Sequence, residues 1–277
     1  MELVGKAAPY LLAHGSSSPR LDAELLLAEV LGCQRMDLYM QFDRPLIDSE
    51  LVRFRELCRR RAGGEPIAYI RERREFMSLE FRVSPDVLVP RPETEVLVSE
   101  AVRRLTERGG EGVYRGLDVG TGSGAIAIAL LVAVPNLTMV ATEISPAAVE
   151  VATGNAERHG VSDRLEIRVV DLVDGVTGPF DVVCANLPYI DPDWPDAVDP
   201  SVRASEPHIA LFAGTNGMDL IGRLLPELPR LLLPGGTGYV EIDPRQAEDA
   251  TARAAEIGDV NVISDLAGRE RLLVIRR

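Results

Sequence analysis

Hydrophobic residues recur at helical spacing through the first part of the chain. Ser18 and Pro19 are typical of a helix start, and the apolar positions that follow recur every three or four residues until Gly32. Asp48 precedes a second segment of this kind, which ends near Gly63. Because each segment has one apolar face, the pattern predicts a small helical bundle over residues 1–75.

The spacing of apolar residues changes after this bundle. Between residues 76 and 90 they alternate in short stretches, which predicts a β-hairpin that links two domains. The prolines of Pro90–Glu95 hold the next segment extended, and Thr94 is placed to cap the helix that follows. We therefore expect a second domain over residues 91–277.

Segments typical of strands and of helices alternate along this second domain. Short apolar runs are separated by longer segments with helical spacing, which is typical of an open sheet with mostly parallel strands. The pattern predicts an α/β, Rossmann-like fold with seven strands and a closing antiparallel strand. The predicted strands are residues 117–119, 137–142, 165–170, 180–185, 238–242, 260–263 and 271–275, and the helices between them include 125–134, 146–160, 220–233 and 245–255.

Three alternating glycines stand where the first strand of this sheet meets its helix. Glycine lets the backbone turn sharply and approach a ligand, and free N–H groups at the helix start face whatever is bound. Gly120, Gly122 and Ala125 also match the dinucleotide pattern G-x-G-x-x-A, so a nicotinamide or flavin enzyme is one interpretation. The predicted cofactor-binding residues of this loop are Gly120, Thr121, Gly122, Ser123 and Gly124.

A second motif, Asn186-Leu187-Pro188-Tyr189, follows the fourth predicted strand. It has the form N-x-P-Y and lies at the carboxyl end of the strand, the edge where ligands bind in an open α/β sheet. Alone, it is also consistent with an ordinary strand end and a proline turn. Together with the glycine loop, it is typical of enzymes that transfer a methyl group from S-adenosylmethionine to a planar –NH2 group.

The tetrapeptide supplies groups suited to a nitrogen that is a poor nucleophile. The lone pair of an amide or aromatic amino nitrogen is delocalised, so it has to be directed at the methyl group. The side-chain oxygen of Asn186 can accept one N–H hydrogen bond, and the backbone carbonyl of Leu187 can accept the second. Pro188 fixes the backbone between them and Tyr189. Tyr189 offers a flat surface for stacking. Asn186 and Tyr189 are the predicted catalytic residues, and all four residues form the predicted substrate site.

Three further residues at strand ends are candidates for cofactor binding. Glu143 ends the second predicted strand about 20 residues after the glycines, where an acid can accept hydrogen bonds from ribose hydroxyls. Asp171 and Leu172 follow the third strand and are placed to contact an adenine amino group and its ring. The alternatives are an exposed strand-end acid at Glu143 and a turn cap at Asp171. Asn186 also belongs to the predicted cofactor site.

Composition restricts the setting in which such a site works. The formal net charge of −13 disfavours binding to phosphate backbones, so no direct contact with nucleic acid is expected. The sequence contains neither a signal-peptide core nor an apolar run long enough for a membrane span. The three cysteines and three histidines have no metal-ligand spacing. We expect a cytoplasmic monomer without a metal.

Arginines gather between Arg53 and Arg74, in an otherwise acidic chain. One interpretation is a docking face for an acidic or RNA-associated partner. The other is a solvated helix face on which the arginines pair with nearby glutamates. Those glutamates are Glu56, Glu65, Glu72 and Glu75.

Several stretches together carry a resemblance to a known family. They are Ser18–Leu27, Gly64–Tyr69, Val89–Glu95, Leu117–Gly124, Asn186–Ile190, Glu206-Pro207 with Ala210-Leu211, and Asp265–Arg271. In these stretches the chain resembles peptide chain release factor glutamine methyltransferases of the HemK/PrmC type. The resemblance covers nearly the whole length of the chain.

The resemblance implies a specific reaction. A methyl group passes from S-adenosylmethionine, leaving S-adenosylhomocysteine, to the side-chain amide of the glutamine in the Gly-Gly-Gln motif of class I release factors, which modulates translation termination. In the family, the loop matched by Gly120–Gly124 and the acid matched by Glu143 bind the cofactor. The tetrapeptide matched by Asn186–Tyr189 holds the glutamine, and the N-terminal helical domain helps to grip the release factor.

The chain departs from the family pattern at three positions. Leu187 replaces a usual proline, Leu172 stands where an aromatic residue often packs on adenine, and Arg71 stands where glycine is common. Asn-Leu-Pro-Tyr also occurs in ribosomal RNA adenine dimethyltransferases, so a nucleic-acid adenine methyltransferase is an alternative. An NAD(P)-dependent oxidoreductase and a catalytically silent cofactor-binding adaptor are the other two alternatives.

Overall fold

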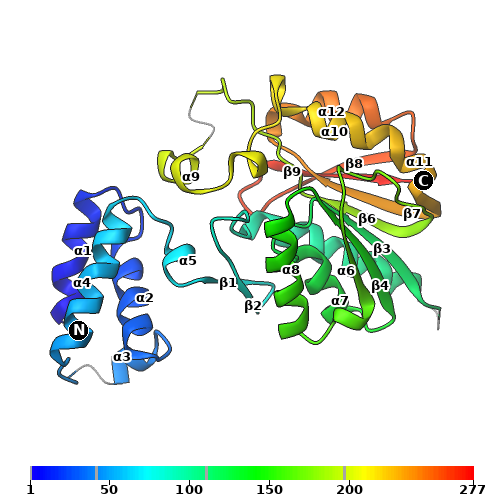
Figure 1. Ribbon diagram of the computed structural model, residues 1–277. Helices are drawn as coiled ribbons and strands as arrows, with labels where there is room; N and C mark the ends of the chain where they lie inside the picture. Colours follow the sequence, from blue (N-terminus) through cyan, green and yellow to red (C-terminus); the bar gives the residue numbers. More distant parts are fainter. Residues whose placement is uncertain (1, 41–42, 110–111, 196–197) are drawn as a thin grey trace. The chain divides into compact units, whose positions relative to one another are not determined.

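The computed structural model describes residues 2–40, 43–109, 112–195 and 198–277 (Figure 1). The chain forms two compact units, one of residues Met1–Arg73 with Val198–Ser205, and one of residues Arg74–Ala197 with Glu206–Arg277. Each unit has its own hydrophobic core. The finer division into residues 1–75, 76–90 and 91–277 stays a prediction.

The first unit is built from helices whose apolar faces share one core. Leu11, Leu26 and Phe54 come from three different helices and are at most 3% exposed. Burying side chains of this size stabilises the fold by roughly 1.5–3 kcal/mol each, which holds these helices together. The helices of this unit are α1 (Glu2–Ala13), α2 (Pro19–Leu31), α3 (Asp37–Met40), α4 (Asp48–Ala62), α5 (Ile67–Ile70) and α9 (Pro200–Ser205).

The start of α2 differs from the predicted cap. Ser18 occupies the N-cap position, but its side chain makes no cap hydrogen bond. Its backbone N–H donates to Ser16 Oγ at 3.3 Å, and the Ser16 hydroxyl donates to Asp22 Oδ2 at 2.8 Å. Pro19 in the first turn and the left-handed Gly32 at the end match the sequence prediction.

Arginines of the predicted cluster form ion pairs within this unit. Glu65 is the partner that sequence proximity indicates. The other two acidic partners, Asp22 and Glu29, come from α2, which lies far from the arginines in sequence. The docking interpretation of the cluster stays a prediction. The pairs are Arg60–Glu65, Arg61–Asp22, Arg71–Glu29 and Arg73–Glu29.

A seven-stranded sheet forms the centre of the second unit (Figure 1), in the order β5-β4-β3-β6-β7-β9-β8. The first five strands of this order are parallel, and β9 is antiparallel to both of its neighbours. The predicted Rossmann-like fold is therefore confirmed, including its closing antiparallel strand. The strands are β3 (Tyr114–Val119), β4 (Leu137–Glu143), β5 (Leu165–Val169), β6 (Phe180–Ala185), β7 (Leu232–Glu241), β8 (Asp259–Ser264) and β9 (Glu270–Arg276).

Helices cover both faces of the sheet, because successive strand residues point to opposite sides. In β6, Val182 and Cys184 join the core with α6, α7 and α8, whereas Val183 and Ala185 join the core with α10, α11 and α12. Figure 1 shows these two layers on either side of the sheet. The helices are α6 (Glu95–Arg108), α7 (Ala125–Ala133), α8 (Pro146–Arg158), α10 (Asp219–Leu224), α11 (Leu228–Leu231) and α12 (Ala247–Ala254), with 3-10 turns η1 (Pro92–Thr94), η2 (Ser162–Arg164), η3 (His208–Ala210), η4 (Thr215–Gly217), η5 (Leu225–Glu227) and η6 (Pro244–Gln246).

The segment predicted as one helix over residues 220–233 is broken. Pro226 and Pro229 lack the N–H that a continuous helix needs, and they stand in η5 and α11, which follow α10.

Residues 234–236, predicted as a turn, lie inside β7, where a register shift separates the pairs of Leu232 and Thr237. The strand therefore begins earlier than the sequence predicts, because a bulge accommodates the two glycines.

The predicted hairpin exists but is shorter. It pairs β1 (Arg73–Phe76) with β2 (Leu79–Arg82). Met77 and Ser78 both have left-handed backbone angles, with φ of 50° and 59°, as a tight two-residue hairpin turn requires. Residues 83–89 form no strand, since Ser84 accepts from Val87 N–H in a turn of their own.

Among the helices that the structure describes, none is both long and apolar enough to cross a membrane. A group of three or more His, Cys, Asp or Glu side chains suited to a metal ion is likewise not found in the described part of the chain.

Candidate active site

A cavity opens at the carboxyl ends of the parallel strands of the second unit. Most of the predicted site residues line it, although they come from four separate strand ends. Gly124 and Tyr189 do not line it. Of the predicted residues, those that line it are Gly120, Thr121, Gly122, Ser123, Glu143, Asp171, Leu172, Asn186, Leu187 and Pro188.

The glycine loop joins β3 to α7 and is fixed from both sides. The N–H groups of Gly120 and Thr121 both donate to Thr142 O at 2.9 Å, which ties the loop to β4. Gly120 has φ of +73°, and a Cβ there would lie 2.9 Å from Leu187 Cδ2. Glycine is therefore needed both for the backbone angle and for the close approach of the tetrapeptide. A Cβ at Gly124 would instead meet Ile128 of α7 and Ala152 of α8, so this glycine faces the contact between the two helices and not the cavity.

Glu143 holds the loop in a fixed shape through its carboxylate. Gly122 N–H donates to Oε2 at 2.9 Å, while the N–H groups of Ile144 and Ser145 donate to Oε1 at 2.9 and 3.0 Å. Oε2 accepts only one of these bonds, so it keeps a lone pair for a hydrogen bond from the cavity side. Glu143 is thus more than an exposed strand-end acid, the alternative considered from sequence.

Asp118 is buried beneath the loop and was not among the predicted site residues. Its Oδ2 accepts hydrogen bonds from Thr121 Oγ1 at 2.7 Å and from Ala127 N–H at 3.3 Å. Complete burial raises the pKa of Asp118 to about 6, and the negative charge of Glu143 acts in the same direction. The sequence did contain a signal for this residue. Asp118 stands inside the stretch Leu117–Gly124, and an acidic residue in a buried strand is rare unless it has a role.

Asn155 of α8 is a second residue that sequence reasoning missed. Its Nδ2 donates to Ser123 O and to Arg82 O, both at 2.9 Å, and its Oδ1 accepts from Arg82 N–H at 2.8 Å. The side chain is fully buried, so these bonds join the glycine loop to the hairpin without competition from water. A lone asparagine in a helix gives no local signal of this role.

Asp171 and Leu172 lie after β5 at the cavity wall. Asp171 Oδ2 accepts from Arg223 at 2.8 Å, in a pair that is about half exposed. Leu172 has φ of 49°, a strained angle for a leucine, which sets the direction of its side chain. The cavity thus combines carboxylates, backbone N–H groups and apolar side chains, a set that fits a nucleoside cofactor.

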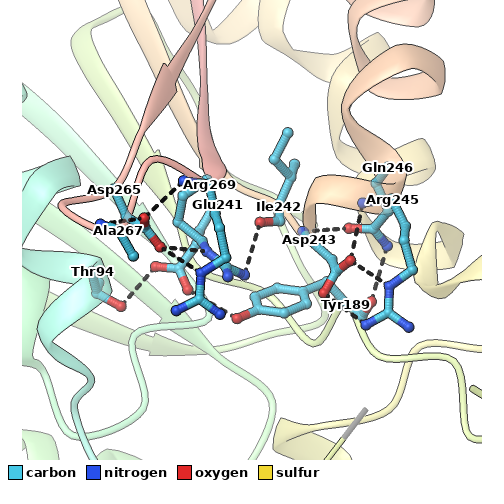
Figure 2. A network of polar contacts seen from close by, with 11 residues as sticks. Thr94, Tyr189, Glu241, Ile242, Asp243, Arg245, Gln246, Asp265, Ala267 and Arg269 are labelled. Atoms are coloured by element: carbon cyan, nitrogen blue, oxygen red, sulfur yellow. Dashed lines mark hydrogen bonds and ion pairs between the residues drawn. The ribbon is translucent and has the colours of Figure 1, made fainter. Parts of the chain in front are cut away.

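The tetrapeptide is held by a network of polar contacts. Asn186 Nδ2 donates to Thr94 Oγ1 at 2.9 Å. The Tyr189 hydroxyl donates to Glu241 Oε1 at 3.1 Å (Figure 2). Gln246 Nε2 donates to Tyr189 O at 2.9 Å. Within the described part of the chain, Asn186 Oδ1 and the Leu187 carbonyl oxygen have no hydrogen-bond partner. These two oxygens are the acceptors that the sequence predicts.

Thr94 does not cap its helix as the sequence predicts. It occupies the N-cap position of α6 without a side-chain cap bond. Its hydroxyl donates to Glu241 Oε2 at 2.7 Å and accepts from Asn186. The hydroxyl oxygen that would accept from a backbone N–H in a cap accepts from Asn186 instead, and the hydroxyl proton goes to a buried carboxylate, so tertiary contacts replace the cap.

Tyr189 lies beside the cavity rather than in its wall. Burial and the charge of Glu241 raise the pKa of its hydroxyl, and its ring packs against the core that Leu117 and Val183 share. This location favours a positioning role for Tyr189. The stacking role expected from sequence stays a prediction.

Arg91 lines the cavity next to the tetrapeptide. Its guanidinium donates to Glu206 Oε1 at 2.5 Å, and Val89 N–H donates to Glu206 Oε2 at 3.2 Å. The Glu206 side chain is fully buried, so one carboxylate fixes both the extended segment and the arginine. These residues stand in the family stretches quoted above, which is the signal that could have identified them.

Comparison with known proteins agrees with this arrangement. Residues 2–71 match the family model described as the PrmC N-terminal domain, and residues 94–198 match the methyltransferase small domain. The release factor glutamine methyltransferase of Rhodopirellula baltica is 42% identical, over 100% of this chain and 96% of the relative. The chain belongs to the release factor glutamine methyltransferase family. The enzyme of the same name from Koribacter versatilis is 40% identical, over 98% of this chain and 96% of the relative.

Membership of the release factor glutamine methyltransferase family confirms the resemblance seen in the sequence. It makes the chain an S-adenosylmethionine-dependent methyltransferase, so the oxidoreductase interpretation of the glycine loop is wrong. Two solved structures agree with the fold. A Pyrococcus furiosus methyltransferase is similar with a TM-score of 0.52 at 20% identity, over 72% of this chain and 88% of that one. The N-terminal domain of human METTL16 in complex with SAH gives 0.51 at 16% identity, over 82% of each chain.

Proposed function

We propose that this chain transfers a methyl group from S-adenosylmethionine to the side-chain amide nitrogen of a glutamine in class I peptide chain release factors. The glutamine is that of the Gly-Gly-Gln motif, and the modification modulates translation termination. One observation carries the proposal: Asn186 Oδ1 and the Leu187 carbonyl oxygen are both available as acceptors beside the glycine loop. A primary amide has two N–H groups, so two acceptors can hold it.

The cofactor site in this proposal is the wall formed by the glycine loop and two strand-end acids. Glu143 accepts from the ribose hydroxyls, while Asp171 and Leu172 contact the adenine amino group and ring. The backbone of residues 120–123 lies against the amino-acid part, and Asn186 borders the reacting end. S-adenosylmethionine supplies, when bound, an electrophilic methyl group on a sulfonium centre.

The tetrapeptide directs the amide in this proposal. Asn186 and Leu187 each accept one N–H bond, which stabilises the positive charge that develops on nitrogen and turns its lone pair toward the methyl group. Pro188 restricts the backbone so that the Leu187 carbonyl keeps its direction. The methylated nitrogen loses its proton readily to water, so these residues suffice without a histidine or cysteine base.

The remaining parts of the proposal concern the partner and the setting. The helical segment of residues 1–75 helps to bind the release factor, and the methyltransferase domain of residues 91–277 carries the chemistry. We propose that the protein acts as a monomer in the cytoplasm and needs no direct contact with nucleic acid. The net charge of −13 supports the last point, because it opposes binding to phosphates.

A transfer assay tests the function. Purified protein with radiolabelled S-adenosylmethionine should label an intact class I release factor, and mass spectrometry should place the methyl group on the Gly-Gly-Gln glutamine. A release factor with that glutamine changed to alanine should stay unlabelled. Label that persists on the altered factor, or that appears in RNA or DNA instead, would contradict the proposal and favour an adenine methyltransferase.

A further inference from the structure

We propose that Thr94, held by Glu241, is a positioning residue that sets which end of the Asn186 carboxamide faces the substrate. The inference rests on the proposed function, because it concerns the acceptor that binds the glutamine amide. Neither residue belongs to the predicted site. Thr94 comes from η1 and Glu241 from the carboxyl end of β7, so the chain brings them to Asn186 only through the fold.

Two of the three residues in this contact are buried, and the third, Asn186, is half-buried at the cavity wall. Thr94 and Glu241 are 4% and 2% exposed. Thr94 Oγ1 lies 2.7 Å from Glu241 Oε2 and 2.9 Å from Asn186 Nδ2. Because Thr94 and Glu241 are largely shielded from water, a polar group left unpaired on either side chain would carry much of the cost of its desolvation.

The directions of the hydrogen bonds follow from the number of protons available. An ionised carboxylate can only accept, so Thr94 must give its single hydroxyl proton to Glu241. The hydroxyl oxygen can then only accept from Asn186, which places the –NH2 end of the amide toward Thr94. Oδ1 is thereby the end that remains for the substrate. A flipped amide would offer two donors to a substrate amide that also donates.

The second oxygen of Glu241 fixes the other end of the tetrapeptide (Figure 2). It accepts from the Tyr189 hydroxyl at 3.1 Å, so one carboxylate is linked to the first and last residues of the motif. Burial raises the pKa of Glu241, whereas the bonds from Thr94 and Tyr189 and the charge of Arg271 favour its ionised form. Through this pairing the carboxylate keeps Leu187 and Pro188 between two fixed points.

Thr94→Val tests the inference, because valine keeps the shape and removes the hydroxyl. We expect kcat for release factor methylation to fall about 10-fold, the effect of one lost hydrogen bond, with the KM and Kd for S-adenosylmethionine unchanged. Thr94→Ser should restore most of kcat. Thr237→Val is the matched control, since Thr237 is also buried in β7 at 1% exposure and its hydroxyl has no partner within the described residues. It should keep wild-type kcat.

A double-mutant cycle separates positioning from general loss of structure. If Thr94 acts through Asn186, then Thr94→Val should not lower kcat any further in a protein that already carries Asn186→Ala. Glu241→Gln, which leaves one side-chain acceptor oxygen in place of two, should likewise lower kcat in the wild-type background and not in Asn186→Ala. Losses that multiply in the double variants, or a wild-type kcat for Thr94→Val, would overturn the inference. Failure of the wild-type protein to label the release factor would instead contradict the proposed function.

Discussion

The backbone N–H of Gly122 donates to Glu143 Oε2 at 2.9 Å, across 21 residues of sequence. This bond joins the glycine loop after β3 to the end of β4, the neighbouring strand. Two more backbone N–H groups donate to the other oxygen of the same carboxylate. Glu143 therefore shapes the loop before any ligand is bound, and a ligand need not supply the ordering energy itself.

Glu143→Ala should weaken the binding of S-adenosylhomocysteine about 10-fold to 100-fold, because hydrogen bonds to a charged group contribute roughly 1.5–3 kcal/mol. Isothermal titration calorimetry measures the change. Glu166→Ala is the control: Glu166 lies on β5, pairs with Arg168, and its side chain is 59% exposed. An unchanged Kd for Glu143→Ala would remove this residue from the cofactor site.

Gly120→Ala should lower the free energy of unfolding by about 2–3 kcal/mol, since alanine at φ of +73° is strained and its Cβ would lie 2.9 Å from Leu187 Cδ2. Gly268→Ala separates the two effects. Gly268 has φ of +76° with nothing within 4 Å, so this variant should lose only the backbone part, about 1–2 kcal/mol. Urea denaturation gives both values. Equal losses would show that Leu187 does not restrict this position.

Asp118 should make stability depend on pH. Folding raises its pKa from 3.8 to about 6. The folded state then holds the proton more tightly, so this stabilisation is present below the unfolded pKa and is lost as the pH rises through about 6. Between about pH 4.5 and pH 7.5 the wild type should lose about 2 kcal/mol relative to Asp118→Asn. Urea unfolding curves at several pH values measure this difference, and a difference that is independent of pH would contradict the assignment.

Local patterns were sufficient to predict most of the fold. The apolar run of β6 and the continuous apolar segment of α7 lie within one residue of the predicted bounds. Both are short-range signals, because a buried strand or helix is defined by its own side chains. The β7 bulge was missed since Pro-Gly-Gly is equally typical of a turn, and only the neighbouring strands decide between the two.

The chemistry of the site was predictable where a motif carries it within a few residues. The glycine loop, Glu143 and the tetrapeptide were found in this way, and the structure brings them to one cavity. The partners of Thr94 could not be found, because they are 92 and 147 residues away and any threonine before a helix resembles a cap. The direction of the Tyr189 side chain could not be predicted for the same reason, since it depends on the distant residue Glu241.

Glu206→Ala should lower the free energy of unfolding by about 3 kcal/mol, because it leaves the Arg91 guanidinium and Val89 N–H without their buried partner. Asp249→Ala is the control, because it removes an ion pair whose two side chains are each 50% exposed. It should lower the free energy of unfolding by less than about 0.5 kcal/mol. Chemical denaturation compares the two. Since Arg91 also lines the cavity, Glu206→Ala should in addition weaken S-adenosylhomocysteine binding, whereas Asp249→Ala should not. Similar losses of stability in both variants would mean that solvent replaces the carboxylate at Arg91, and that burial of Glu206 is not what fixes the extended segment.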